Sequence, residues 1–197
     1  DVKHDGRHKA RVVARGDLTP TPVDSVYSGV VSLRGLRTCI FLAELNGMRP
    51  FATDIGNAYL EAKTCEKVCI CAGPEFGNLC GHLLIIDKAL YGLRYSGKMF
   101  EELLAECLTD FGFKRSKAER NLFLRKCPDA EHYEYVGTYV DDLCIVMKDP
   151  EAFLEELQSE PYNFKLKGSG EVAFHLGCGF VRDSTGTLCM CTGCAPD

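Results

Sequence analysis

YVGTYVDDLCIVM, residues 135–147, carries two adjacent carboxylates between two apolar runs of strand-forming residues. This pattern predicts a hairpin in which one strand ends near Val140 and the next begins near Leu143, so that Asp141 and Asp142 lie at its tip. Two acids at a tight turn are often only solvated turn residues. This turn, however, contains neither Gly nor Asn, and adjacent like charges repel. A divalent cation that neutralises the pair is the sharper explanation.

The elements around this hairpin are expected from periodicity and from turn residues. Helices are expected at 25–45, 96–111 and 151–159, and the first is expected to stop at Asn46-Gly47. Strands are expected at 9–15, 49–55, 67–71, 83–87, 122–126, 133–139, 143–147, 164–167, 174–181 and 187–191, with a hairpin turn at 183–186. Because strands pair locally and helices lie between them, we expect an α+β fold. Its antiparallel sheet would have helices packed on one face.

Bulk composition is that of a soluble globular protein, with 46% hydrophobic and 26% charged residues in a chain of 197. No run of about 18 apolar residues predicts a membrane helix. The first residues include neither an apolar leader nor an initiator Met, so we expect a fragment of a larger polyprotein. The net charge of −5 is unusual for a nucleic-acid binder, although residues 1–15 are locally basic. A mixed soluble surface is the plainer interpretation of that charge.

The twelve cysteines are irregularly spaced, and several lie inside strand-like apolar runs. Free thiols in a reducing compartment are therefore favoured over a disulfide framework. The tightest cluster is Cys189, Cys191 and Cys194. Such a cluster could hold zinc, but no second pair follows it, so the sequence leaves this question open.

A third carboxylate, Asp54, lies in FATDIGNAYL, residues 51–60, after an apolar strand and before a Gly. If that strand lies beside the hairpin, Asp54 comes close to Asp141 and three carboxylates converge. Magnesium prefers oxygen ligands and keeps waters for a phosphate substrate. Two such ions, about 3.5–4 Å apart, can hold the attacking and leaving oxygens of an in-line displacement. The alternative is that Asp54 only caps the following turn.

Six short segments follow one another along the chain: KARVVARG (9–16), Tyr27-Ser28, DIGNAY (54–59), KALYGLR (88–94), YVDD (139–142) and His175-Leu176-Gly177. Together they resemble the motifs of copia-type LTR retrotransposon reverse transcriptases. The YVDD box alone is a modest signal, whereas six motifs in the family's order are a strong one. The chain departs from the family at three positions. Gly29 replaces a Pro, Tyr95 stands where a Gln or a small residue is usual, and Phe100 stands where a Trp is usual.

The resemblance implies a right-hand polymerase palm with partial fingers. Residues 1–50 would be the partial fingers, 51–60 the palm with the first catalytic motif, and 61–95 a fingers/palm insertion. Residues 96–160 would be the palm with the YVDD hairpin, and 161–197 the end of the palm with primer-grip hairpins. The thumb would be truncated.

The implied activity is that of an RNA-directed DNA polymerase, a nucleotidyltransferase that joins a dNTP to a primer 3′-hydroxyl. Asp54, Asp141 and Asp142 would be catalytic, and these three with Ile55 would bind two Mg²⁺ ions, with Mn²⁺ as the alternative. Positioning and charge neutralisation would carry the catalysis.

The resemblance also implies binding residues, each with a plainer alternative. The residues expected to bind the dNTP are Lys9, Arg11, Tyr59, Tyr91 and Gly92, and those expected to form the primer grip are Leu176 and Gly177. Tyr59 would exclude a 2′-hydroxyl, or it is only a core aromatic. Lys9 and Arg11 would hold the triphosphate; the alternative is that they are solvated strand charges. Tyr91 and Gly92 would border the nucleotide; the alternative is that they form a helix-capping turn. Lys165 or Lys167 could protonate the pyrophosphate.

The implied partners are an RNA or DNA template with its primer, dNTPs and the remainder of a polyprotein, whose integrase and RNase H regions are absent here. No membrane partner is expected. The expected location is the cytoplasm, within a virus-like particle, with the nucleus as the alternative. Two other functions stay open: a degenerate, non-catalytic retroelement remnant that at most binds nucleic acid, and another palm-type nucleotidyl enzyme such as a cyclase.

Overall fold

The computed structural model describes residues 6, 8, 12–20, 23–128 and 130–192. The chain forms two compact units. One comprises Asp1–Ser28 with Ala58–Leu103, and the other comprises Gly29–Asn57 with Leu104–Asp197. The helix α3 (Ser96–Asp110) contributes residues to both. The two units are therefore described one after the other.

The larger unit is built on a six-stranded sheet in the order β4-β5-β6-β7-β1-β8, and every pairing in it is antiparallel. Its strands are β1 (Arg49–Ile55), β4 (Lys114–Arg115), β5 (Leu122–Lys126), β6 (Tyr133–Tyr139), β7 (Asp142–Met147) and β8 (Leu166–Glu171). The predicted central hairpin is confirmed, because β6 pairs with β7. The early strand β1 is inserted between the later strands β7 and β8.

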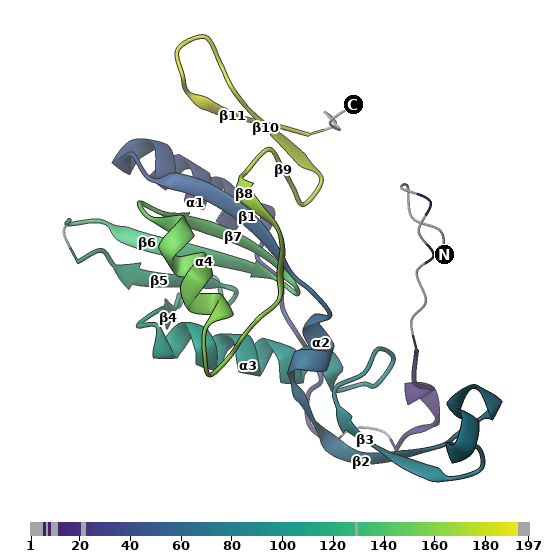
Figure 1. Cartoon of the computed structure of the whole chain (residues 1–197). Helices are drawn as coiled ribbons and strands as arrows, with labels where there is room; N and C mark the ends of the chain where they lie inside the picture. The colour runs from purple at the N-terminus through teal and green to yellow at the C-terminus, as the bar shows by residue number, and fades with distance from the viewer. Residues whose placement is uncertain (1–5, 7, 9–11, 21–22, 129, 193–197) are drawn as a thin grey trace. The chain divides into compact units, whose positions relative to one another are not determined.

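Helices cover both faces of this sheet, so the prediction that they pack on one face is wrong. Cys144 and Val146 of β7 share a buried cluster with Cys39 and Ile40 of α1 (Leu33–Asn46). The alternating residues of β7 are equally buried and face the other side, where α4 (Pro150–Gln158) contacts β1 and β7 (Figure 1). An uninterrupted apolar run such as 143–147 is typical of a strand covered on both faces.

Local hydrogen bonds set the ends of the first helix. The Ser32 side chain accepts a hydrogen bond from the N–H of Gly35, so α1 begins at Leu33 and not at the predicted residue 25. Just before it, the N–H of Val31 donates to the carbonyl of Thr138 in β6. The predicted stop is confirmed, because Gly47 adopts a left-handed conformation with φ of 60°.

The last strands form a separate three-stranded sheet of β9 (Phe174–His175), β10 (Cys178–Arg182) and β11 (Leu188–Thr192). The single strand predicted for 174–181 is wrong, because Leu176 and Gly177 turn the chain with φ of 50° and 77°. The predicted turn at 183–186 is confirmed, since β10 pairs with β11. The buried Cys178 and Phe180 join this sheet to the core cluster on the α1 side.

The smaller unit carries a long antiparallel ribbon of β2 (Lys63–Cys71) and β3 (Leu83–Lys88) (Figure 1). It also contains α2 (Ala58–Glu61) and the 3-10 turns η1 (Gly16–Leu18) and η2 (Pro74–Leu79). The strand predicted for 9–15 falls partly outside the described residues, and 12–15 form no strand. Within the described part of the chain, no helix is long and apolar enough to span a membrane.

The predicted fold class is correct at the coarse level. The chain is a mixed α and β protein with antiparallel sheets and few helices. Its division into palm and fingers stays a prediction.

Candidate active site

The ends of β1 and β7 bring two of the three predicted carboxylates together. In the antiparallel register of these strands, Asp54 lies directly opposite Asp142. Opposite residues of an antiparallel pair point to the same face, with Cβ atoms about 4.5–5.5 Å apart. The carbonyl of Asp141 accepts a hydrogen bond of 2.8 Å from the N–H of Ile55. The backbone therefore gathers Asp54, Ile55, Asp141 and Asp142 at one end of the sheet.

The turn that carries the acidic pair has a strained backbone. Tyr139 pairs with Asp142, so the turn between β6 and β7 consists of Val140 and Asp141. Val140 has a φ of 56°, a region that a β-branched residue enters only at a cost. Strain of this kind, on the order of 1–3 kcal/mol, is concentrated at functional sites. The strain favours a role beyond chain reversal for this turn.

The ionised form of Asp142 is disfavoured at this point. Burial, followed by the charges of Asp141 and Asp54, raises the pKa of Asp142 above its ordinary value. The charges of Asp141 and Asp54 therefore repel that of Asp142. A divalent cation relieves such repulsion.

The donor chemistry fits Mg²⁺, although the side chains are not arranged as a closed metal cage. Among the described residues, no three His, Cys, Asp or Glu side chains form a ready metal-binding group. A magnesium site needs only one or two protein carboxylates, because water and substrate phosphates supply the other ligands. The framework of Asp54, Asp141 and Asp142 meets that lower requirement.

Two lysines of β8 and the segment before it lie beside the carboxylates. Lys167 is opposite Asp54 in the pairing of β1 with β8. The carbonyl of Lys165 accepts a hydrogen bond of 2.7 Å from the N–H of Gly56. A Cβ atom at position 56 would lie 2.6 Å from the Lys167 Nζ atom. Sequence reasoning named these lysines but had no signal for the role of Gly56 in admitting one of them.

The predicted dNTP-binding residues that the structure describes belong to the smaller unit. The rings of Tyr59 and Tyr91 lie 4.9 Å apart between centroids, and Phe100 lies at 6.4 Å from Tyr59 in an edge-on contact. Tyr59 therefore has a fixed ring that is only half buried. Lys9 and Arg11 lie outside the described residues.

Gly92 has a structural reason for lacking a side chain. Its φ is 91°, and a Cβ atom there would lie 2.1 Å from the carbonyl oxygen of Ala14. The N–H of Ala14 in turn donates to the carbonyl of Tyr91 at 2.7 Å, and the Arg94 side chain donates to the carbonyl of Gly16 at 2.8 Å. Two of the motifs quoted above, at 9–16 and 88–94, are thus held against each other.

The predicted primer-grip residues form the turn between β9 and β10. Leu176 is partly buried against the core cluster, whereas Gly177 has open space around it. The preceding His175 is 5% exposed, its Nε2 atom has no hydrogen-bond partner, and burial lowers its pKa. This His is therefore a neutral, packed side chain at the base of the turn.

The cysteine cluster at the end of the chain is only partly described, because Cys194 lies outside the described residues. The thiol of Cys189 donates to the carbonyl of Thr187, and that of Cys191 donates to the carbonyl of Gly179. These two thiols are thus engaged with the backbone of their own hairpin.

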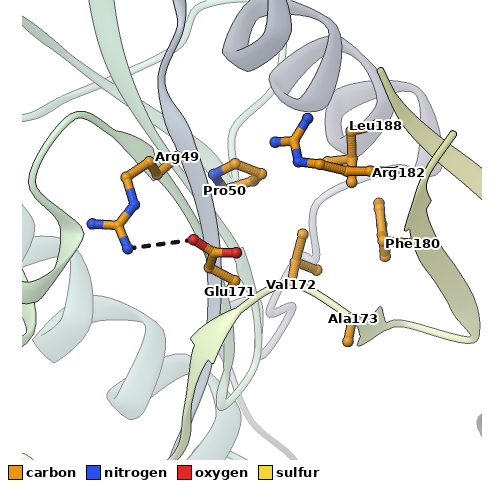
Figure 2. Close-up of a pocket in the computed structure, with 8 residues that line it drawn as sticks. All are labelled: Arg49, Pro50, Glu171, Val172, Ala173, Phe180, Arg182 and Leu188. Atoms are coloured by element: carbon orange, nitrogen blue, oxygen red, sulfur yellow. Dashed lines mark hydrogen bonds and ion pairs between the residues drawn. The ribbon is translucent and has the colours of Figure 1, made fainter. Parts of the chain in front are cut away.

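A cavity of about 230 Å³ lies near the start of β1, away from the carboxylates. Figure 2 shows its apolar walls, among them Phe180 and Leu188, with Arg49 hydrogen-bonded to Glu171. Arg182 at its rim is ion-paired to Glu44. Both arginines are thus already neutralised, and none of the predicted site residues lines this cavity.

Comparison with known proteins gives a consistent result. A family model described as reverse transcriptase (RNA-dependent DNA polymerase) matches residues 1–192. A retrovirus-related Pol polyprotein from transposon RE1 of Arabidopsis thaliana is 27% identical over 184 residues, which cover 91% of this chain and 12% of that protein.

Yeast proteins give similar matches. The transposon Ty1-DR5 and Ty1-LR2 Gag-Pol polyproteins of Saccharomyces cerevisiae are each 30% identical over 174 residues, or 86% of this chain and 10% of theirs. The chain thus spans only about a tenth of the length of these relatives. No solved structure matches it.

Proposed function

Because the chain belongs to the reverse transcriptase (RNA-dependent DNA polymerase) family, we propose that it extends a primer by nucleotidyl transfer from dNTPs. One relationship carries the proposal: Asp54 lies opposite Asp142 while Ile55 binds the backbone of Asp141. Residues from two distant stretches of chain are thereby held at one point, as a shared phosphoryl-transfer site requires. The substrates would be an RNA or DNA template with its primer, and dNTPs.

Asp54, the backbone of Ile55, Asp141 and Asp142 would hold two Mg²⁺ ions, or Mn²⁺ in their place. When bound, such ions supply Lewis acidity toward the transferred phosphate and lower the pKa of the attacking hydroxyl. The carboxylates would hold these cations at the end of the sheet, where the cations would offset the developing negative charge. Burial, followed by the charges of Asp141 and Asp54, raises the pKa of Asp142, and a bound cation would relieve that repulsion. Lys165 or Lys167, beside Asp54, would give a proton to the leaving pyrophosphate.

Nucleotide selection is proposed for the smaller unit. The ring contacts with Tyr91 and Phe100 give Tyr59 the fixed position that a steric filter against a 2′-hydroxyl needs. Lys9 and Arg11 would bind the triphosphate, and Gly92 would border the nucleotide. Leu176 and Gly177 would support the primer.

We place this activity within a larger retrotransposon polyprotein that works in cytoplasmic virus-like particles or in the nucleus. The competing proposal is a remnant that folds without polymerising. A primer-extension assay separates them: an RNA template with a DNA primer, dNTPs and Mg²⁺ is offered to the wild type, Asp141→Asn and Asp87→Asn.

Asp87 is an exposed residue of β3, outside the proposed machinery, so its variant is the matched control. Extension by the wild type and by Asp87→Asn, with loss of at least a hundredfold in Asp141→Asn, supports the polymerase. Equal extension by all three proteins contradicts the assigned carboxylates, and extension by none supports the remnant. Cyclisation of ATP or GTP without template would support a cyclase.

A further inference from the structure

Two exposed thiols stand side by side on the β2–β3 ribbon. Cys69 and Cys71 occupy alternate positions of β2, so both project from the same face of the ribbon. Their partners in the register are Ile85 and Leu83, which are 66% and 75% exposed. This face of the ribbon is therefore an open, apolar surface with two free thiols toward the end where Cys71 pairs with Leu83.

The spacing of the two thiols suits a shared ion better than a disulfide. Residues two apart on a strand have Cα atoms about 6.6 Å apart. That distance is near the upper limit of about 6.8 Å for a disulfide, so a direct bond would require the strand to distort. An ion placed between the two sulfur atoms bridges the same gap without backbone movement.

The number of donors identifies the kind of ion. A structural zinc site needs four ligands, and among the described residues no three His, Cys, Asp or Glu side chains form a metal-binding group. Cys65 lies within the irregular stretch between Lys63 and Val68, outside the regular pairing that carries Cys69 and Cys71, and is not a third member. Soft thiolates with few partners select Cu(I), which two of them satisfy. We propose that Cys69 and Cys71 form a two-thiolate binding site for Cu(I).

Binding would release one proton from each thiol to solvent and leave the copper as Cu(I), so no oxidant or reductant takes part. The chain contains a second pair with the same spacing, Cys189 and Cys191 of β11. Their thiols donate to carbonyl oxygens of the same hairpin, and Cys191 is partly buried. This second pair therefore offers a comparison with the same spacing but with hydrogen-bonded thiols, one of which is partly buried.

The test is a competition for Cu(I) between the reduced, oxygen-free protein and the chelator bicinchoninate. We expect the wild type to take one equivalent of Cu(I) from the chelator. Cys69→Ser and Cys71→Ser should each weaken binding at least tenfold, whereas Cys65→Ser and the double variant Cys189→Ser/Cys191→Ser should bind as the wild type does. Circular dichroism checks that each variant is folded.

Alkylation at one equivalent of Cu(I), read by mass spectrometry, identifies the thiols involved. Protection that depends on copper and is confined to Cys69 and Cys71 supports the site, whereas buried thiols such as Cys39 and Cys144 should react equally slowly with and without copper. The proposal would be overturned if the wild type fails to take copper or if copper protects other cysteines. It would also be overturned if Cys65→Ser loses as much copper affinity as Cys69→Ser and Cys71→Ser do. None of these readouts depends on polymerase activity, so the outcome is independent of the proposed function.

Discussion

The Lys167 side chain occupies the space that a side chain at Gly56, just after β1, would need. A Cβ atom on residue 56 would lie 2.6 Å from both Cε and Nζ of Lys167 and 3.1 Å from the carbonyl oxygen of Lys165. Lys167 is also the cross-strand neighbour of Asp54. The absence of a side chain at position 56 therefore lets a positive charge lie beside the carboxylates.

Gly56→Ala should displace the end of the Lys167 side chain at only a small cost in unfolding free energy, because the atoms that must move are the far end of a flexible side chain. Primer extension should fall further than stability does, because the displaced charge lies next to Asp54. Gly170→Ala in β8, the strand that carries Lys167, is the control, since nothing lies within 4 Å of its added Cβ atom. Urea unfolding and extension rates measure the two effects. If Gly56→Ala matches Gly170→Ala in both, the steric argument is wrong.

The strained turn residue offers a second prediction. Val140→Gly should raise the free energy of unfolding by about 1 kcal/mol or more, because Gly adopts a φ of 56° without strain. If the strain helps to hold Asp141 in place, extension should fall although stability rises. Denaturant unfolding and kcat report the two quantities separately. A loss of stability would show instead that the Val140 side chain contributes packing that outweighs its backbone strain.

Local features of this fold could be predicted from the sequence because they depend on near neighbours. The 133–147 hairpin, the stop at Gly47 and the turn after Arg182 are set by alternation and by turn residues within a few positions. The burial of β7 on both faces could also have been predicted, since its five apolar residues follow one another without a polar break.

Non-local features could not be predicted in this way. Residues 49–55 carry no local signal that β1 pairs with both β7 and β8, so the approach of Asp54 to the hairpin could be predicted only on the condition that the two lie side by side. The break at Leu176 was missed because Leu seldom adopts positive φ, so only the surrounding packing can impose that turn. The backbone contact between Ala14 and Gly92 likewise joins segments far apart in sequence.

The raised pKa of Asp142 predicts that the stability of the protein changes with pH. The pKa of Asp142 is raised in the folded state. Its contribution to the free energy of unfolding is therefore fully present below the ordinary Asp pKa and is lost as pH rises through the raised value. Asp142→Asn should therefore be more stable than the wild type at neutral pH, and this gain should shrink in acid. Adding Mg²⁺ should stabilise the wild type more than the variant.

Asp183 is the control of opposite sign. Hydrogen bonds from Thr185 and Thr187 lower its pKa, so its contribution is present above the ordinary Asp pKa and is lost as pH falls through the lowered value. Asp183→Asn should lose stability at neutral pH and approach the wild type in acid. Thermal unfolding across pH 3–7 compares both variants. Parallel curves for the two would refute the electrostatic assignments.

The proposed selection by Tyr59 can be tested without removing its neighbours. Tyr59→Ala should lower the preference for dNTP over rNTP, measured as the ratio of kcat/KM values, by at least tenfold. Tyr59→Phe keeps the ring that contacts Tyr91 and Phe100 and should keep the preference. An unchanged ratio in Tyr59→Ala would assign the ring to the core alone.

Asn121 links the segment before α1 to the β6–β7 hairpin. Its buried Nδ2 group donates to the carbonyl of Gly29 at 3.0 Å and to the Thr138 hydroxyl at 3.2 Å. Asn121→Ala should cost about 1–3 kcal/mol of unfolding free energy, because it leaves buried acceptors unpaired. Asn121→Asp keeps the shape but turns the donor into an acceptor, so at neutral pH it should cost at least as much.

The half-buried Asn46 is the comparison, since its side chain donates only to the carbonyl of Leu42 within α1. Asn46→Ala should cost well under half as much in urea unfolding. A tolerated Asn121→Asp would mean that shape and not the donated hydrogen bonds holds Gly29 to β6. Because Thr138 is four residues before Asp142, a real loss at Asn121 should also slow extension, and Asn46→Ala should not.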